Sequence, residues 1–170
     1  VHPYPVVDAG PDRVVLQGGS ITIQPQVTGN DLQYAWSPAT YLNNTTSGRP
    51  IASNVQADIG YQLTVTSRGG CKSSDNMLVK VLLAPKIPNT FTPNGDGINE
   101  VWEIDYLDTY PNNRVQVFNR AGQLVFESRG YKTPWNGTMR GKPLPFDTYY
   151  YIIEPESGRK PVTGYVTIVK

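Results

Sequence analysis

The chain has 170 residues, and its 15 basic and 14 acidic residues leave a formal net charge of +1. No basic stripe suits the phosphate backbone of a nucleic acid, and no apolar run reaches the ~20 residues of a membrane-spanning helix. We therefore expect neither nucleic-acid binding nor membrane insertion. The single cysteine, Cys71, excludes an intramolecular disulfide.

Short runs of alternating apolar and polar residues fill the first half of the chain. Sixteen glycines and fifteen prolines interrupt the sequence too often for long helices. Alternation with period two predicts strands that bury one face. The alternating apolar residues are Ile21 and Ile23, Tyr34 and Trp36, Tyr61, Leu63 and Val65, and Met77, Val79 and Val81.

The second half repeats this pattern. Gly122 lies between two alternating runs and predicts a hairpin, because glycine accepts the positive φ of a tight turn. The alternating residues are Val115 and Val117, Leu124 and Phe126, Tyr149, Tyr151 and Ile153, and Val166 and Ile168.

A proline-containing connector, Leu83-Ala84-Pro85-Lys86-Ile87-Pro88, separates the two halves. We place the domains at 1–84 and 85–170, each long enough to bury a core of its own. Short strands at regular spacing in each half predict an all-β chain of two tandem immunoglobulin-like antiparallel β-sandwiches.

Four motifs follow one another in the first domain. They are Asp8-Ala9-Gly10-Pro11-Asp12, Gly18-Gly19-Ser20-Ile21-Thr22-Ile23, Tyr34-Ala35-Trp36-Ser37-Pro38-Ala39 and Tyr61-Gln62-Leu63-Thr64-Val65-Thr66. With these motifs, the first domain resembles the PKD-like (polycystic-kidney-disease-type) modules of bacterial surface proteins. The resemblance implies an immunoglobulin-like fold, a central strand that buries Trp36, and a role as a spacer or adhesive stalk.

Five motifs follow one another in the second domain. They are Asn89-Thr90-Phe91-Thr92-Pro93-Asn94-Gly95-Asp96-Gly97, Val117-Phe118-Asn119-Arg120-Ala121-Gly122, Trp135-Asn136-Gly137, Thr148-Tyr149-Tyr150-Tyr151 and Gly164-Tyr165-Val166-Thr167-Ile168. In this order, they make residues 85–170 resemble the gliding-motility-associated C-terminal domain of Bacteroidetes, the type B sorting domain of the type IX secretion system.

This second resemblance implies a C-terminal sorting signal. Cargo that carries such a domain crosses the periplasm, is recognised by the outer-membrane machinery through a partner of the PorP/SprF kind, and reaches the cell surface or the medium. The start of the chain, Val1-His2-Pro3-Tyr4-Pro5, lacks the basic and apolar regions of a signal peptide. We therefore expect either a cytoplasmic protein or the far end of a longer exported chain, and the β-rich composition favours the exported chain.

A candidate calcium loop lies at the start of the second domain. Acidic and amide side chains alternate there with glycines, and calcium prefers oxygen ligands in such a loop. The candidate ligands are Asn94, Asp96, the Ile98 carbonyl, Glu100 and Glu103. Thr92 occupies the first ligand position, where calcium loops carry Asp. The alternative is a loop of Asx turns in which Asn94 and Asp96 bond their own backbone.

The recognition surface is expected on strand edges and on the loops around 94–100 and 135–145. Its candidate residues are Asn94, Asp96, Asn99, Trp135, Lys142 and Tyr150. The rival hypothesis is a cell-surface adhesin or carbohydrate-binding tip, in which Trp135, Tyr131 and Tyr150 stack against sugars. Aromatic residues in small sandwiches mostly fill cores, which is the expectation for Trp36 and Tyr149.

Catalysis is not expected. His2 is the only histidine, so a Ser-His-Asp triad, a Cys-His pair and a histidine-based zinc site are excluded. Paired carboxylates, of the kind that glycoside hydrolases use, are the remaining option. The candidates, Asp105 with Asp108 and Glu154 with Glu156, lie where solvated charges are usual.

Overall fold

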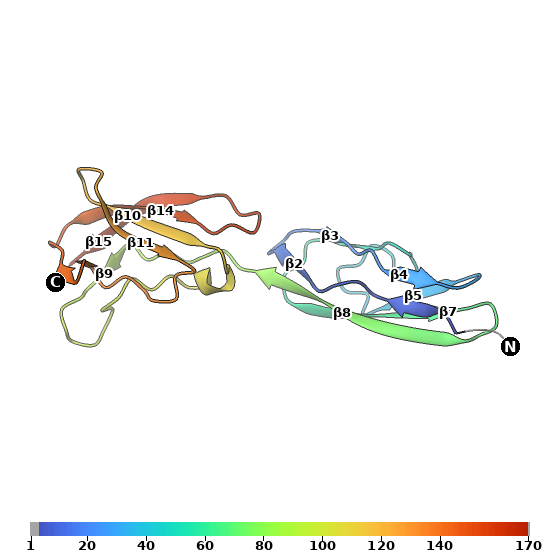
Figure 1. The fold of residues 1–170 in the computed structure, drawn as a ribbon. Helices are drawn as coiled ribbons and strands as arrows, with labels where there is room; N and C mark the ends of the chain where they lie inside the picture. The colour runs from blue at the N-terminus through green and yellow to red at the C-terminus, as the bar shows by residue number, and fades with distance from the viewer. Residues whose placement is uncertain (1–3, 170) are drawn as a thin grey trace. The chain divides into compact units, whose positions relative to one another are not determined.

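The computed structural model describes residues 4–169, so His2 lies outside the described residues. The chain forms two compact units, Val1–Leu83 and Ala84–Lys170, and the predicted boundary lies one residue from this division. The described part is built from β-strands (Figure 1), and its helical element is a three-residue 3-10 turn, Leu107–Thr109. Within residues 4–169, no helix has the length and apolar character needed to cross a membrane. The all-β prediction is confirmed.

The first unit contains a four-stranded sheet in the order β2-β8-β7-β5. Its strands are β2 (Arg13–Leu16), β5 (Gln33–Ser37), β7 (Ile59–Thr66) and β8 (Lys72–Leu82). β7 pairs antiparallel with both β5 and β8, whereas β2 joins β8 in parallel, a departure from the purely antiparallel expectation. Two short antiparallel pairs complete the unit, β1 (Val6–Asp8) with β4 (Gln26–Thr28) and β3 (Ile21–Thr22) with β6 (Ile51–Ala52).

Trp36 lies in the core of the first unit, as its alternation within β5 predicts. Its side chain is buried, and the indole N–H donates to the Ser47 carbonyl at 3.0 Å. Tyr61, from the neighbouring strand β7, is buried as well and donates its hydroxyl proton to the Thr40 carbonyl at 2.7 Å. Burial of a polar aromatic is favourable only when its polar atom finds such a partner.

The second unit contains a five-stranded sheet in the order β11-β10-β14-β15-β9. Its strands are β9 (Thr90–Phe91), β10 (Arg114–Phe118), β11 (Leu124–Arg129), β14 (Thr148–Glu154) and β15 (Val162–Ile168). The ladders are antiparallel except for the parallel pair β15–β9. A small hairpin joins β12 (Thr138–Met139) to β13 (Lys142–Pro143).

One predicted alternation fails in β11. The sequence places Leu124 and Phe126 on the same face, but the register between β10 and β11 shifts at Val117 and Phe118. Such a bulge inserts one residue, so the faces exchange on its two sides. Val125 is consequently buried while Leu124 is partly exposed.

Candidate functional site

Two buried tryptophans join the loops of the second unit that the sequence singles out. The Trp102 backbone N–H donates to the Trp135 carbonyl at 2.7 Å, and the Trp135 backbone N–H donates to the Tyr131 hydroxyl at 3.1 Å. That hydroxyl donates in turn to the Trp102 carbonyl at 2.5 Å. The rings of Trp102 and Trp135 meet edge to face, with centroids 6.3 Å apart. This cluster fixes the segment that follows each tryptophan.

The structure corrects the prediction that Trp135 and Tyr131 present their rings at the surface. Their exposed fractions are 1% and 5%. The Trp135 ring packs against Phe91 and Tyr149, and its indole N–H donates to the Thr138 carbonyl at 3.0 Å. The ring is therefore fully used inside the unit, so neither Trp135 nor Tyr131 can stack against a sugar.

The loop from 92 to 100 is held by its own side chains. Asn94 accepts the backbone N–H of Asp96 at 3.1 Å, and Asp96 accepts that of Ile98 at 2.8 Å. The Glu100 carboxylate accepts the Gly97 N–H at 2.9 Å. Positive φ values of 84° and 86° at Gly95 and Gly97 allow the chain to turn between these bonds. These contacts are the Asx turns of the alternative interpretation.

The same bonds occupy the oxygens that the calcium hypothesis assigns to a metal. The Ile98 carbonyl accepts the Thr92 hydroxyl at 3.1 Å, and the exposed Glu103 makes no side-chain bond within the described residues. Across residues 4–169, no three acidic, histidine or cysteine side chains gather as a metal site requires. The geometry favours the Asx-turn loop, and calcium binding stays a prediction.

The two loops predicted to carry recognition line one hollow of about 490 Å³. Pro93, Gly95, Glu100 and Val101 contribute one side. The other side comes from Asn136, Gly137, Thr138, Pro143, Leu144 and Phe146. Gly137 has a φ of 74°, and an added Cβ would lie 3.1 Å from Ile168, so the turn requires glycine. We refer to this hollow as the loop hollow.

The remaining predicted recognition residues lie in two places. Asn99 belongs to the loop at the hollow, where its carbonyl accepts the Thr92 N–H at 2.8 Å, and its φ is 53°. Lys142 is exposed on β13, next to Pro143, which lines the hollow. Tyr150 lies on β14 with half of its surface exposed, and belongs to the sheet instead of the loops.

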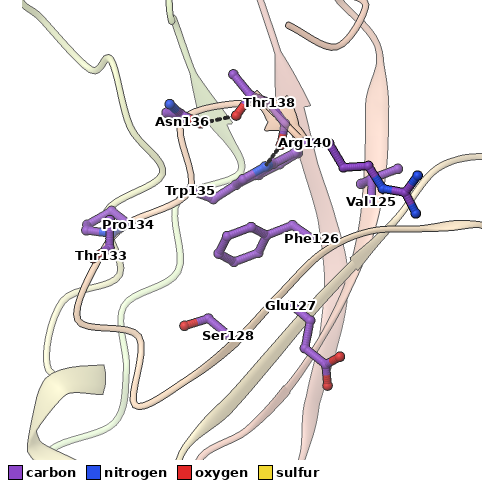
Figure 2. Close-up of a pocket in the computed structure, with 10 residues that line it drawn as sticks. All are labelled: Val125, Phe126, Glu127, Ser128, Thr133, Pro134, Trp135, Asn136, Thr138 and Arg140. Carbon is purple, nitrogen blue, oxygen red and sulfur yellow. Dashed lines mark hydrogen bonds between the residues drawn. The ribbon is translucent and has the colours of Figure 1, made fainter. Parts of the chain in front are cut away.

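A second hollow of about 410 Å³, which the sequence did not predict, borders strand β11 (Figure 2). In its wall, Phe126 packs against the buried ring of Trp135, with ring centroids 5.8 Å apart. Glu127 and Arg140 lie at its margins. The signal that could have indicated this site is the distribution of charge, because residues 124–146 hold four basic side chains and one acidic side chain. We refer to it as the edge hollow.

Three of the four acidic residues considered for catalysis have contacts with neighbouring residues of the chain. Glu154 lies 3.7 Å from the Arg114 guanidinium, and Asp105 forms a backbone bridge with Lys86. Glu156 has a φ of 67° and lies in the turn that its carbonyl closes with Arg159. Of these three residues, Glu154 is held through its carboxylate, whereas the contacts of Asp105 and Glu156 are made by their backbones. Asp108 is exposed on the 3-10 turn.

Because of the Tyr131 hydroxyl, we expect the second unit to lose stability at high pH. Burial raises the pKa of this hydroxyl well above 10, although the N–H donated by Trp135 opposes the shift. The folded pKa exceeds the unfolded one, so the contribution is complete below pH 10 and is lost as the pH rises further. We expect Tyr131→Phe to cost about 1–3 kcal/mol at pH 7 through the lost hydrogen bonds. In the variant, the free energy of unfolding should also fall less steeply above pH 10. Part of the fall should remain, because burial raises the pKa of Tyr149 and of Tyr151 as well.

The check is urea denaturation of the wild type and the variant at pH 7 and at several values above pH 10. Equal slopes of stability against pH above 10 in the two proteins would contradict the role assigned to Tyr131.

Comparison with solved structures supports the fold. IG1 and IG2 of DIP-gamma match with 12% identity, a TM-score of 0.52, and coverage of 98% of this chain and 97% of that one. The D1–D4 ectodomain fragment of ICAM-5 matches with 8% identity and a TM-score of 0.52, over 95% of this chain and 48% of that one. These likenesses confirm two immunoglobulin-like domains in tandem.

A PKD domain from the KIAA 1837 protein is a further structural neighbour. It has 23% identity and a TM-score of 0.40, over 45% of this chain and 85% of that one. No curated protein sequence matches the chain.

The family comparison concerns the second unit. Residues 85–168 match the family model of the CHU_C type IX secretion signal domain. The match spans the strands, both loops and both hollows described above. Neither this family nor the tandem immunoglobulin structures point to a catalytic family. The second unit of this chain is therefore a CHU_C type IX secretion signal domain, the C-terminal sorting signal of a secreted protein.

Proposed function

We propose that the second unit is a folded recognition signal, read at the outer membrane by a PorP/SprF-like component of the type IX machinery. Delivery to the cell surface or the medium follows, and the first unit serves as a spacer. The observation that carries this proposal is the loop hollow, where the two loops expected to be recognised line one concave site. Recognition needs such a surface and no reactive group.

The loops are ordered by contacts that exist without a partner. The Asx turns fix one loop, and the bond between Trp102 and Trp135 joins it to the other. A surface that is already ordered loses little conformational entropy on binding, which favours affinity. This arrangement suits a signal that must be recognised after the cargo has folded.

The test is to fuse the whole chain to a periplasmic reporter in a host with a type IX system. We expect the reporter at the cell surface or in the medium, and we expect it in the periplasm when the chain is truncated after Leu83. Deleting the PorP/SprF-like component should have the same effect as the truncation. Export of the truncated fusion would contradict the proposal.

A carbohydrate-binding tip is the second candidate, and one feature of the sheet favours it. Tyr150 and Tyr165 are direct partners across β14 and β15, and their exposed fractions are 50% and 52%. Exposed aromatic rings can stack against sugar rings. A glycan array separates the two candidate functions. The carbohydrate-binding tip requires glycan binding that Tyr150→Ala removes, whereas the sorting signal requires no glycan binding.

A further inference from the structure

Strand β11 forms an edge of the five-stranded sheet, and part of its backbone has no partner strand among residues 4–169. The Gly130 N–H donates to the Asn113 carbonyl at 2.8 Å, which makes these two residues a hydrogen-bonded pair at the end of the β10–β11 ladder. Hydrogen-bonded and non-bonded pairs alternate along an antiparallel ladder. The pairs Arg114–Arg129 and Gln116–Glu127 alternate with Val115–Ser128. Arg129 and Glu127 therefore direct their backbone N–H and C=O groups away from β10.

The edge hollow lies beside this backbone edge. β11 contributes Val125, Phe126, Glu127 and Ser128 to its lining. The segment from Thr133 to Arg140 forms the opposite wall, as Figure 2 shows. The space of about 410 Å³ is within the range of ligand sites in proteins. A strand that pairs with β11 would lie beside Phe126, a partly buried apolar side chain of this lining.

The stretch of chain that forms this edge and the wall of the edge hollow is mostly basic. Four basic side chains lie along residues 124–146, and all are exposed. They are Arg129, Lys132, Arg140 and Lys142. In the part of the chain that the structure describes, none of the four forms an ion pair. The one carboxylate of this stretch, Glu127, is already paired with Arg114 at 2.8 Å.

We propose that the β11 edge and the edge hollow bind an extended, acidic segment of a partner polypeptide, which adds a strand to the sheet. Main-chain hydrogen bonds to an edge strand recognise an extended backbone, and alternate side chains of the added strand reach the neighbouring surface. The basic side chains select acidic residues in that strand. The inference rests on the proposed function in one respect, the identity of the partner as a component of the secretion machinery.

The same charges explain why this edge does not pair with itself. An unprotected edge strand invites a second copy of the same chain, and proteins prevent this with charged side chains. Two β11 edges brought together would bring basic residues of both copies close, and like charges repel. An acidic strand is instead attracted to these basic residues. The same charges therefore disfavour pairing with a second copy and favour a partner of complementary charge.

The experiment measures peptide binding to the whole chain by fluorescence anisotropy. The probe is a labelled synthetic peptide of about nine residues, a length typical of a strand, in which valine and glutamate alternate. The comparison peptide has lysine in place of glutamate. We expect the acidic peptide to bind with an affinity that falls as salt is added, and the basic peptide not to bind.

Two further arms test the two halves of the proposal. The double variant R140E/K142E should weaken acidic-peptide binding by about tenfold or more. The control is K80E, a charge reversal at the exposed Lys80 of β8 in the first unit, which should leave binding unchanged. An acidic peptide with alternate amides N-methylated along one edge cannot form the ladder. We expect the methylated peptide not to bind. Because only the peptide is altered, a loss of binding cannot come from misfolding of the protein.

The proposal is overturned if the acidic peptide fails to bind, if both peptides bind equally, or if the methylated peptide binds as well as its parent. Binding to anionic vesicles in place of the peptide would also overturn it. Failure here leaves the sorting function intact when the whole-chain fusion is still exported. Loss of export from that fusion, by contrast, refutes the sorting function whatever the peptides do.

Discussion

Replacing Trp135 with alanine is expected to lower the free energy of unfolding of the second unit by about 3–5 kcal/mol, because a buried indole is exchanged for a cavity. The ring is 1% exposed and contacts Phe91, Trp102 and Tyr149. Truncation also leaves the Thr138 carbonyl without the indole N–H. The measurement is amide hydrogen exchange along β14, whose protection reports the stability of this unit.

Tyr150→Ala is the matched control. It truncates an aromatic residue of β14 itself, but this side chain is half exposed, so the expected loss of stability is under about 1 kcal/mol. In the secretion assay, Trp135→Ala should retain the reporter in the periplasm because the loops lose their anchor, while Tyr150→Ala should be exported. Equal stability of the two variants would contradict the structural role given to Trp135.

Replacing Trp36 with alanine should cost the first unit about 3–5 kcal/mol and leave β14 exchange unchanged. Trp36 is 4% exposed, and the core around it consists of residues from the first unit, as the core around Trp135 consists of residues from the second. Separate cores allow separate unfolding transitions. Hydrogen exchange along β7 and β14 in the same sample measures both.

This variant also separates the proposed roles of the units. If the first unit is a spacer and the second carries the signal, Trp36→Ala should reduce protection along β7 and leave export of the fused reporter near the wild-type level. A loss of export equal to that of Trp135→Ala would show that the first unit takes part in recognition.

Most strands could be predicted from the sequence because alternation reports directly on burial. The inward residues of β7, Tyr61, Leu63 and Val65, are all buried, and so is Trp36 of β5. Alternation fails at Leu124, where a bulge shifts the register. A bulge depends on the partner strand, so the pattern of one strand alone does not reveal it.

The candidate site was predictable in part. The two loops were identified from glycine and short polar residues, but their meeting at one hollow depends on long-range contacts such as the bond between Trp102 and Trp135. Turn signals around Trp135 indicated a loop and left its burial undecided. Three-dimensional packing decides it, because the ring of a residue in a loop can still point into the core.

The edge hollow was missed for a similar reason. Strand order determines which strand lies at the edge of a sheet, and β11 is followed along the chain by a hairpin instead of a sheet partner. The sequence shows the basic residues of this region, but it does not show that they surround an unpaired backbone.

The most direct test of the central claim is the export of a reporter fused to residues 84–170 alone. The account predicts that these residues suffice to bring the reporter to the cell surface or the medium. It also predicts that the reporter stays in the periplasm when this segment carries Trp135→Ala or when the PorP/SprF-like component is deleted. Retention of the unaltered fusion in the periplasm of a secretion-competent host would contradict the claim that the folded second unit carries the sorting signal.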